Sequence, residues 1–217
     1  MKRRDVFVGG GTLCLLGSSL MPGLVLAQTS VPKAGKEYVR LDRPAPVEAN
    51  ASQVEVVEFF WYNCPHCNAF EPKLGDWLAK LPKHVAFRRV PVAFRADFEP
   101  QQRLYYALEA MGLVDKLHAK VFAAIHGQRL NLNAAPAIAD WVVSQGVDRN
   151  KFTEQFNSFS VATKSKRATQ LQNLYGVSGV PAMGVAGQFY TDGELARSMA
   201  GVLDVVNFLV AQAHAGR

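Results

Sequence analysis

The chain has 217 residues, of which 49% are hydrophobic and 19% charged, and its formal net charge is +6. This composition excludes a disordered, collagen-like or coiled-coil protein and provides enough apolar residues for one sizeable core. No run of five or six basic residues occurs, so we expect no nucleic-acid partner.

The first 27 residues have the pattern of a secretory signal peptide. Basic residues 2–4 precede an apolar run from Val6 to Leu26, and Val25-Leu26-Ala27 is a small-residue cleavage signal. We therefore expect residues 1–27 to be removed on export. An uncleaved membrane anchor is the alternative, which the glycines and Pro22 disfavour. The paired arginines leave both general and twin-arginine export open.

The segment after residue 28 begins as alternating α/β structure. Gln53 to Tyr62 is β-branched and aromatic, which predicts a strand buried on both faces. A helix is expected from Pro65, with Asn63 as its N-cap, because proline is tolerated in a first turn. Val85 to Phe94 predicts a second strand, and the order strand, helix, strand indicates a parallel crossover unit.

From Asp97 to Tyr175 apolar residues recur at spacings of three and four, which indicates helices only. We expect His118 and His126 to be ordinary surface residues of these helices. Two short strands, Ala182 to Val185 and Gln188 to Tyr190, then flank a two-residue hairpin signal. A last amphipathic helix is expected over residues 202–213.

These elements predict an α/β protein with an all-helical insertion. One domain is expected over residues 28–96 and 176–217, and the inserted helical domain over residues 97–175.

The cysteines carry the chemistry. Cys14 would leave with the signal peptide, so that only Cys64 and Cys67 remain. Two cysteines separated by two residues at a strand-to-helix junction can form a disulfide, and the first faces the positive end of the helix dipole. His66 between them also favours a Cys64 thiolate. An acidic thiol beside a resolving thiol is typical of thiol–disulfide exchange.

Three other interpretations of this pair are disfavoured. A structural disulfide across two residues closes too short a loop to constrain the unfolded chain. Zinc would need two more ligands, and the remaining histidines lack metal-ligand spacing. Haem attachment requires histidine directly after the second cysteine, where Asn68 stands. We therefore expect no metal and no other cofactor.

The sequence resembles the DsbA family of bacterial periplasmic thiol:disulfide oxidoreductases. The resemblance covers essentially the whole chain after the signal peptide and depends on three motifs: Glu58-Phe59-Phe60, Cys64-Pro65-His66-Cys67 and Gly179-Val180-Pro181-Ala182. It implies a thioredoxin-like fold with an inserted helical domain.

The resemblance also implies roles for particular residues. The redox-active disulfide would join Cys64 and Cys67, with Pro65 and His66 between them as part of the catalytic motif. Pro181 would follow a cis peptide bond beside the sulfurs, and the Val180 backbone would pair with an incoming peptide. Glu58 would be a buried acid near Cys67. Arg89 stands where the family tends to carry a basic partner, but an arginine cannot shuttle a proton as a lysine can.

The function that this resemblance implies is oxidation of newly exported proteins in the periplasm. Unfolded proteins with free thiols would be the substrates, and a DsbB-like, quinone-linked membrane oxidase would regenerate the disulfide of a monomeric enzyme. A disulfide isomerase or reductant is one alternative function, although residues 28–46 are too few for a separate dimerisation domain. A non-catalytic chaperone-like binding module with a structural CxxC is the other.

Overall fold

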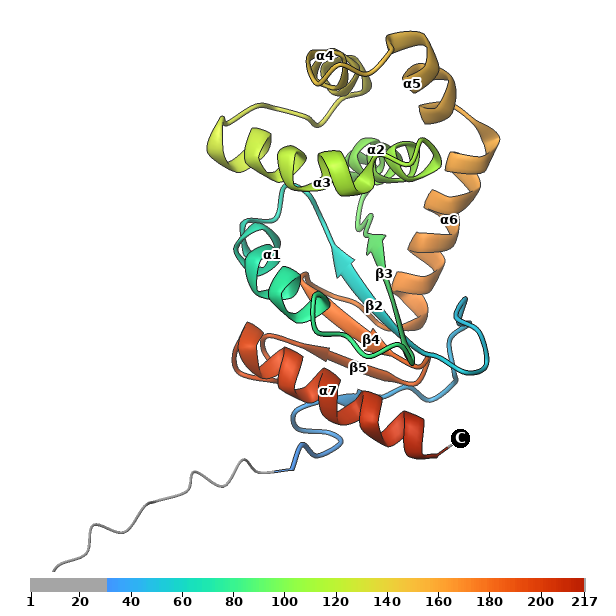
Figure 1. Cartoon of the computed structure of the whole chain (residues 1–217), viewed down its shortest axis with the longest axis vertical. Coiled ribbons are helices and arrows are strands. Elements are labelled where there is room, and N and C mark those ends of the chain that lie inside the picture. The colour runs from blue at the N-terminus through green and yellow to red at the C-terminus, as the bar shows by residue number, and fades with distance from the viewer. Residues whose placement is uncertain (1–30, 217) are drawn as a thin grey trace, which may run out of the picture. The chain divides into compact units, whose positions relative to one another are not determined.

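The computed structural model describes residues 31–216, and the predicted signal peptide lies outside this range. The unit that begins at Pro32 is built on a five-stranded sheet with the strand order β1-β5-β4-β2-β3 (Figure 1). Its strands are β1 (Val39–Arg40), β2 (Val54–Phe60), β3 (Val85–Pro91), β4 (Ala182–Val185) and β5 (Phe189–Asp192). Only β2 and β3 pair in parallel, as the predicted crossover requires.

Helices cover both faces of the sheet (Figure 1). Helices α1 (Pro65–Leu78) and α7 (Met199–Ala215) pack together on one face, and α6 (Phe159–Leu174) lies against the other. All seven side chains of β2 are buried, because alternate residues enter two different cores. Val54 and Val56 contribute to the core beneath α1 and α7, whereas Val57 and Phe59 contribute to the core that includes α6.

The chain between β3 and β4 consists of helices joined by loops and contains no strand, as predicted. It contains the short helix η1 (Ala96–Phe98), then α2 (Glu99–Ala110), α3 (Val114–Phe122), the π-helix η2 (Ala123–Gly127), α4 (Ala135–Ser144), α5 (Arg149–Phe156) and α6. Helices α2 to α5 gather at one end of the sheet, near the start of α1 (Figure 1).

The hairpin between β4 and β5 has the predicted turn. Ala186 and Gly187 have φ angles of 53° and 68°, and the Gln188 amide donates to the Val185 carbonyl over 3.0 Å. Two positive φ angles define a turn whose twist matches the flanking strands. A Cβ on Gly187 would stand 2.4 Å from the carbonyl oxygen of Ala45, so the turn admits only glycine here.

Several boundaries differ from the prediction. Strands β2 and β3 end at Phe60 and Pro91, before the expected Tyr62 and Phe94, and β5 extends to Asp192. Helix α7 is longer at both ends than expected. The prediction also missed β1, whose two exposed residues pair with β5 from within a segment that has no strand pattern. Pairing across the sheet created this strand where local sequence did not indicate one.

Within residues 31–216, no helix combines the length and the apolar character that crossing a bilayer requires. The same residues contain no group of three or more His, Cys, Asp or Glu side chains placed to hold a metal ion.

Candidate active site

Cys64 lies at the junction between the segment that follows β2 and helix α1. Its backbone is extended (φ −78°, ψ 116°), and its Sγ accepts the Cys67 amide hydrogen over 3.3 Å, so Cys64 itself is the N-cap of α1. The predicted cap, Asn63, is one residue too early because Pro65 already occupies the first helical position. The Asn63 side chain instead donates to Asn133 and accepts from Gln101 over 2.8 Å.

The two thiols have different environments. Both cysteines are free, so the structure represents the dithiol form. Cys67 is completely buried, whereas Cys64 keeps 7% of its surface exposed. Pro65 and His66, between them, are exposed to solvent. Cys64 is therefore the sulfur nearer to solvent, and Cys67 lies beneath it.

The loop before β4 approaches Cys64 from the far end of the sequence. The Val180–Pro181 peptide bond is cis, and the Cys64 thiol donates to the Val180 carbonyl over 3.3 Å. Strand β4 starts directly afterwards, at Ala182. The motif around residues 179–182 and the cysteine motif thus form one site.

The start of α1 stabilises a negative charge on Cys64. A hydrogen bond from the Cys67 thiol has the largest effect, and backbone amides of Cys67 and His66 and the His66 side chain add to it, lowering the Cys64 pKa from 9.0 to about 6. Burial raises the pKa of Cys67 instead, far above its ordinary value. The pair therefore consists of one acidic and one strongly basic sulfur.

Glu58 is a buried acid on the strand that leads to the cysteines. It lies on β2 directly opposite Arg89 of β3, and its side chain has no exposed surface. Arg89 Nε is 3.1 Å from Glu58 Oε2, but the contact is too poorly aligned for a hydrogen bond. Burial raises the Glu58 pKa to about 8 although Arg89 opposes it, which favours the protonated carboxyl at neutral pH.

A second carboxylate, Glu71 of α1, competes for the same arginine. Arg89 donates from a terminal nitrogen to Glu71 Oε2 over 3.2 Å, and His118 Nε2 is 3.3 Å from Glu71 Oε1. Burial alone would raise the Glu71 pKa, but these contacts outweigh it and the pKa is lowered. The ionised Glu71 also raises the pKa of Glu58.

The prediction that His118 lies on the surface is wrong. His118 is buried on α3, and its Nδ1 lies 2.9 Å from the Tyr62 hydroxyl. Because a carboxylate only accepts, Nε2 must carry the hydrogen toward Glu71 and Nδ1 must accept from Tyr62. Burial lowers the His118 pKa, in agreement with a neutral ring. His126, half-buried on η2, contacts the Tyr62 carbonyl over 2.8 Å.

Neither Glu71 nor His118 was a site candidate from the sequence. Helical periodicity offered a signal for His118, since Leu117, Val121 and Phe122 place it on the apolar side of its helix. For Glu71 the available signal was its position one turn after Cys67.

Comparison with solved structures places this chain among known proteins. Pseudomonas aeruginosa DsbA matches with a TM-score of 0.81 and 38% identity, over 85% of this chain and 96% of that chain. An oxidoreductase DsbA from Xylella fastidiosa matches with a TM-score of 0.80 and 30% identity, over 86% and 100%.

Sequence comparison agrees. A thiol:disulfide interchange protein DsbA from Burkholderia cepacia is 42% identical over 198 residues, which are 91% of this chain and 93% of the relative. The DsbA of Bordetella pertussis is 41% identical over 202 residues, 93% of this chain and 96% of the relative. A family model described as a DSBA-like thioredoxin domain matches residues 78–203.

A thioredoxin-like sheet with inserted helices, carrying two unlike thiols at a helix start, defines a thiol:disulfide oxidoreductase. The chain belongs to the DsbA family. It is accordingly a dithiol oxidase, which donates a disulfide to other proteins by thiol–disulfide exchange.

Proposed function

We propose that Cys64 is the sulfur that substrates attack and that Cys67 is the resolving thiol. The observation that carries this assignment is the difference between the two sulfurs at the start of α1. Cys64 retains exposed surface and has a pKa of about 6, whereas Cys67 is buried with a raised pKa. Only Cys64 is both reachable by a second protein and stable as a leaving thiolate.

Oxidation of a substrate proceeds in two exchanges. In the first, a substrate thiolate attacks Cys64 Sγ of the disulfide, the bond between Cys64 and Cys67 breaks, and Cys67 departs as a thiolate. Because Cys67 is buried and strongly basic, it takes up a proton. The proposed donor of this proton is Glu58, because burial raises its pKa to about 8 and, when ionised, its charge raises the Cys67 pKa.

In the second exchange another substrate thiolate attacks the substrate sulfur of the mixed disulfide. The Cys64 thiolate is expelled, the substrate gains a disulfide, and the enzyme gains two electrons as the dithiol. The low Cys64 pKa makes it a good leaving group and favours the reduced enzyme.

Val180 and Pro181 bind the polypeptide, and Arg89 has an electrostatic role. The Val180 carbonyl already accepts a hydrogen bond from Cys64, so the backbone here lies beside the reacting sulfur and can pair with an extended substrate segment. Arg89 does not carry a proton, because guanidinium does not deprotonate in proteins. It holds Glu58 and Glu71 instead.

The setting proposed for this chemistry is the periplasm, reached through a cleaved signal peptide over residues 1–27. Newly exported, unfolded proteins are the proposed substrates, the enzyme acts as a monomer, and a DsbB-like membrane oxidase coupled to quinone regenerates the disulfide. The thioredoxin-like domain would comprise residues 28–96 and 176–217, and the inserted domain residues 97–175.

Trapping of mixed disulfides tests the cysteine assignment. Cys67→Ala should accumulate covalent complexes through Cys64, because its thiolate attacks a substrate disulfide and expels one substrate thiolate, and no Cys67 thiol remains to break the new bond. Cys64→Ala should accumulate none. Non-reducing electrophoresis followed by mass spectrometry of the linked peptides would show which sulfur is joined, and equal trapping by the two variants would refute the assignment.

A further inference from the structure

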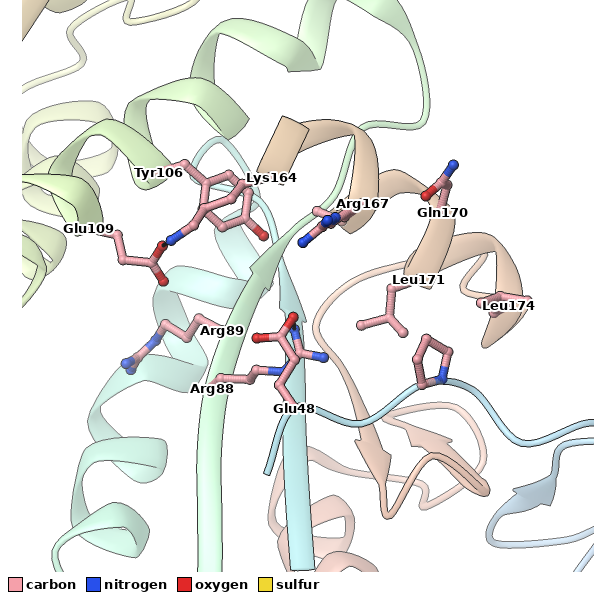
Figure 2. Close-up of a pocket in the computed structure, with 12 residues that line it drawn as sticks. Glu48, Arg88, Arg89, Tyr106, Glu109, Lys164, Arg167, Gln170, Leu171 and Leu174 are labelled. Carbon is pink, nitrogen blue, oxygen red and sulfur yellow. Dashed lines mark hydrogen bonds and ion pairs between the residues drawn. The ribbon is translucent and has the colours of Figure 1, made fainter. Parts of the chain in front are cut away.

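A cavity of about 500 Å³ opens on the face of the sheet opposite α1, between β3, α2 and α6 (Figure 2). None of the residues that line it belongs to the cysteine motif or to the loop around Val180. Arg88 and Arg89 follow one another on β3 and therefore point to opposite faces. Figure 2 shows Arg89 turned away from the other side chains, and its guanidinium lies 3.1 Å from Glu58 and 3.2 Å from Glu71.

One side of this cavity is apolar. Ala168, Leu171 and Leu174 of α6 and Pro46 contribute to its wall, and Leu174 keeps 52% of its surface exposed. Pockets of 300 to 1,000 Å³ with apolar walls and a few converging polar groups are typical small-molecule sites. The cavity has both the size and the apolar surface for the body of a small organic ligand.

Two hydrogen-bond donors in the cavity are unused. Arg167 is exposed and extends from α6 into the space beside Tyr106 (Figure 2), and no other residue in the range 31–216 pairs with its guanidinium. Tyr106 is a buried ring, yet its hydroxyl has no hydrogen-bond partner among the same residues. Burial raises the Tyr106 pKa, so the hydroxyl remains a donor.

The other charges of the cavity are already engaged. Lys164 Nζ lies 2.6 Å from Glu109 Oε2, and Arg88 donates twice to Glu55 at 3.0 and 3.2 Å. Glu48 lies 3.7 Å from Arg88 and is 71% exposed. Its carboxylate therefore lies at the opening of the cavity and is paired with Arg88.

Arg167 and Tyr106 remain as donors without a partner, and the exposed amide of Gln170 offers both a donor and an acceptor. The one unpaired charge among the lining residues within the range 31–216 is therefore positive, which favours an anion.

We propose that this cavity binds an organic anion, with its carboxylate or similar acidic group on Arg167 and Tyr106 and its apolar body against Leu171 and Leu174. The site is separate from the redox site, because it occupies the other face of β3. Binding of an anion in this cavity therefore does not require Cys64 or Cys67 to be a free thiol.

Three probes that differ only in the head group test this site: 4-phenylbutyrate, 4-phenylbutanamide and 4-phenylbutylamine. Each would be titrated into the folded, ¹⁵N-labelled protein in its dithiol form while amide resonances are followed. The butyrate should shift resonances of residues 88, 106 and 167–174 and leave those of residues 64–67 unchanged. The amide and the amine should bind about tenfold more weakly or worse, because they cannot replace a charged hydrogen bond.

Arg167→Gln should weaken butyrate binding about tenfold, and Tyr106→Phe should weaken it by a smaller factor. Lys166→Gln is the matched control, since it removes the same charge from a neighbouring, exposed position outside the cavity. All three variants should keep the thiol–disulfide exchange rate of the parent.

Four results would overturn the proposal: no binding of the butyrate, equal binding of the three probes, equal weakening by Arg167→Gln and Lys166→Gln, or resonance shifts centred on Cys64 and Val180.

Discussion

In the redox site, the surroundings of each side chain determine its protonation and therefore its role. Cys64 and Cys67 have the same chemistry in the unfolded chain, but the helix start gives one of them hydrogen-bond donors and burial deprives the other of water. Glu58 and Glu71 differ in the same way. Glu58 has only a misaligned contact with Arg89, whereas Glu71 accepts from both Arg89 and His118.

His66→Ala should raise the Cys64 pKa above about 6, because the electrostatic contribution of the imidazole is removed while the backbone donors of α1 stay. Following thiolate absorbance near 240 nm against pH would measure the shift. His84→Ala, at the start of β3, is a control with the same substitution away from the site. If His66→Ala titrates like the parent, the helix start alone stabilises the thiolate.

Glu71→Gln should lower the Glu58 pKa from about 8. Two effects act in the same direction: the variant removes a neighbouring negative charge, and it frees Arg89 to face Glu58 alone. The carboxyl ¹³C resonance of Glu58 against pH gives the measurement. Glu99→Gln on the surface of α2 is the control, and a Glu58 pKa that stays constant or rises would contradict the competition for Arg89.

Helices and strands bring these residues together. The sequence predicts some of these helices and strands better than it predicts the contacts between them. Helix α1 and strands β2 and β3 have strong local patterns, so the sequence predicts the junction that carries Cys64 and Cys67. The buried Glu58 and its basic partner Arg89 were expected from the family resemblance alone. Contacts between distant elements have no such pattern. Neither the Glu71–His118 contact between α1 and α3 nor the pairing of β1 with β5 follows from local periodicity.

His118→Phe should destabilise the protein by about 1–3 kcal/mol, because it leaves the buried Tyr62 hydroxyl and one Glu71 oxygen without their partner. Urea unfolding would measure the change. His214→Phe on the exposed end of α7 should change the stability by less than about 0.5 kcal/mol. Equal effects of the two variants would show that the contact from α3 to α1 contributes nothing to stability.

At the scale of the whole molecule, the ionisation of one thiol links redox state to stability. The folded dithiol form stabilises the Cys64 thiolate, and the oxidised form has no thiolate to stabilise. A pKa that folding lowers contributes stability that is complete above the unfolded pKa of 9.0 and is lost as the pH falls through about 6.

The dithiol form should therefore gain on the order of 1 kcal/mol from this group at pH 7, more toward pH 9, and nothing well below pH 6. Urea midpoints of the oxidised and dithiol forms, compared at pH 4, 7 and 9, would measure the difference. Cys64→Ser, which has no thiolate, should show no such pH-dependent gain. If the advantage of the dithiol form in urea midpoint grew as the pH fell, the Cys64 thiolate could not be its cause.

The pairing of β1 with β5 also determines when the sheet can be completed. Residues 39–40 are made early and 189–192 late, so almost the whole chain must be available before this edge forms. Domains fold largely as units, and pairings between distant segments are slow to form. During synthesis, the outer edge of the β4–β5 hairpin can pair only after residues 189–192 have been made and meet the N-terminal segment. Completion of this edge is thus a late event in the life of each new molecule, and an incomplete chain lacks it.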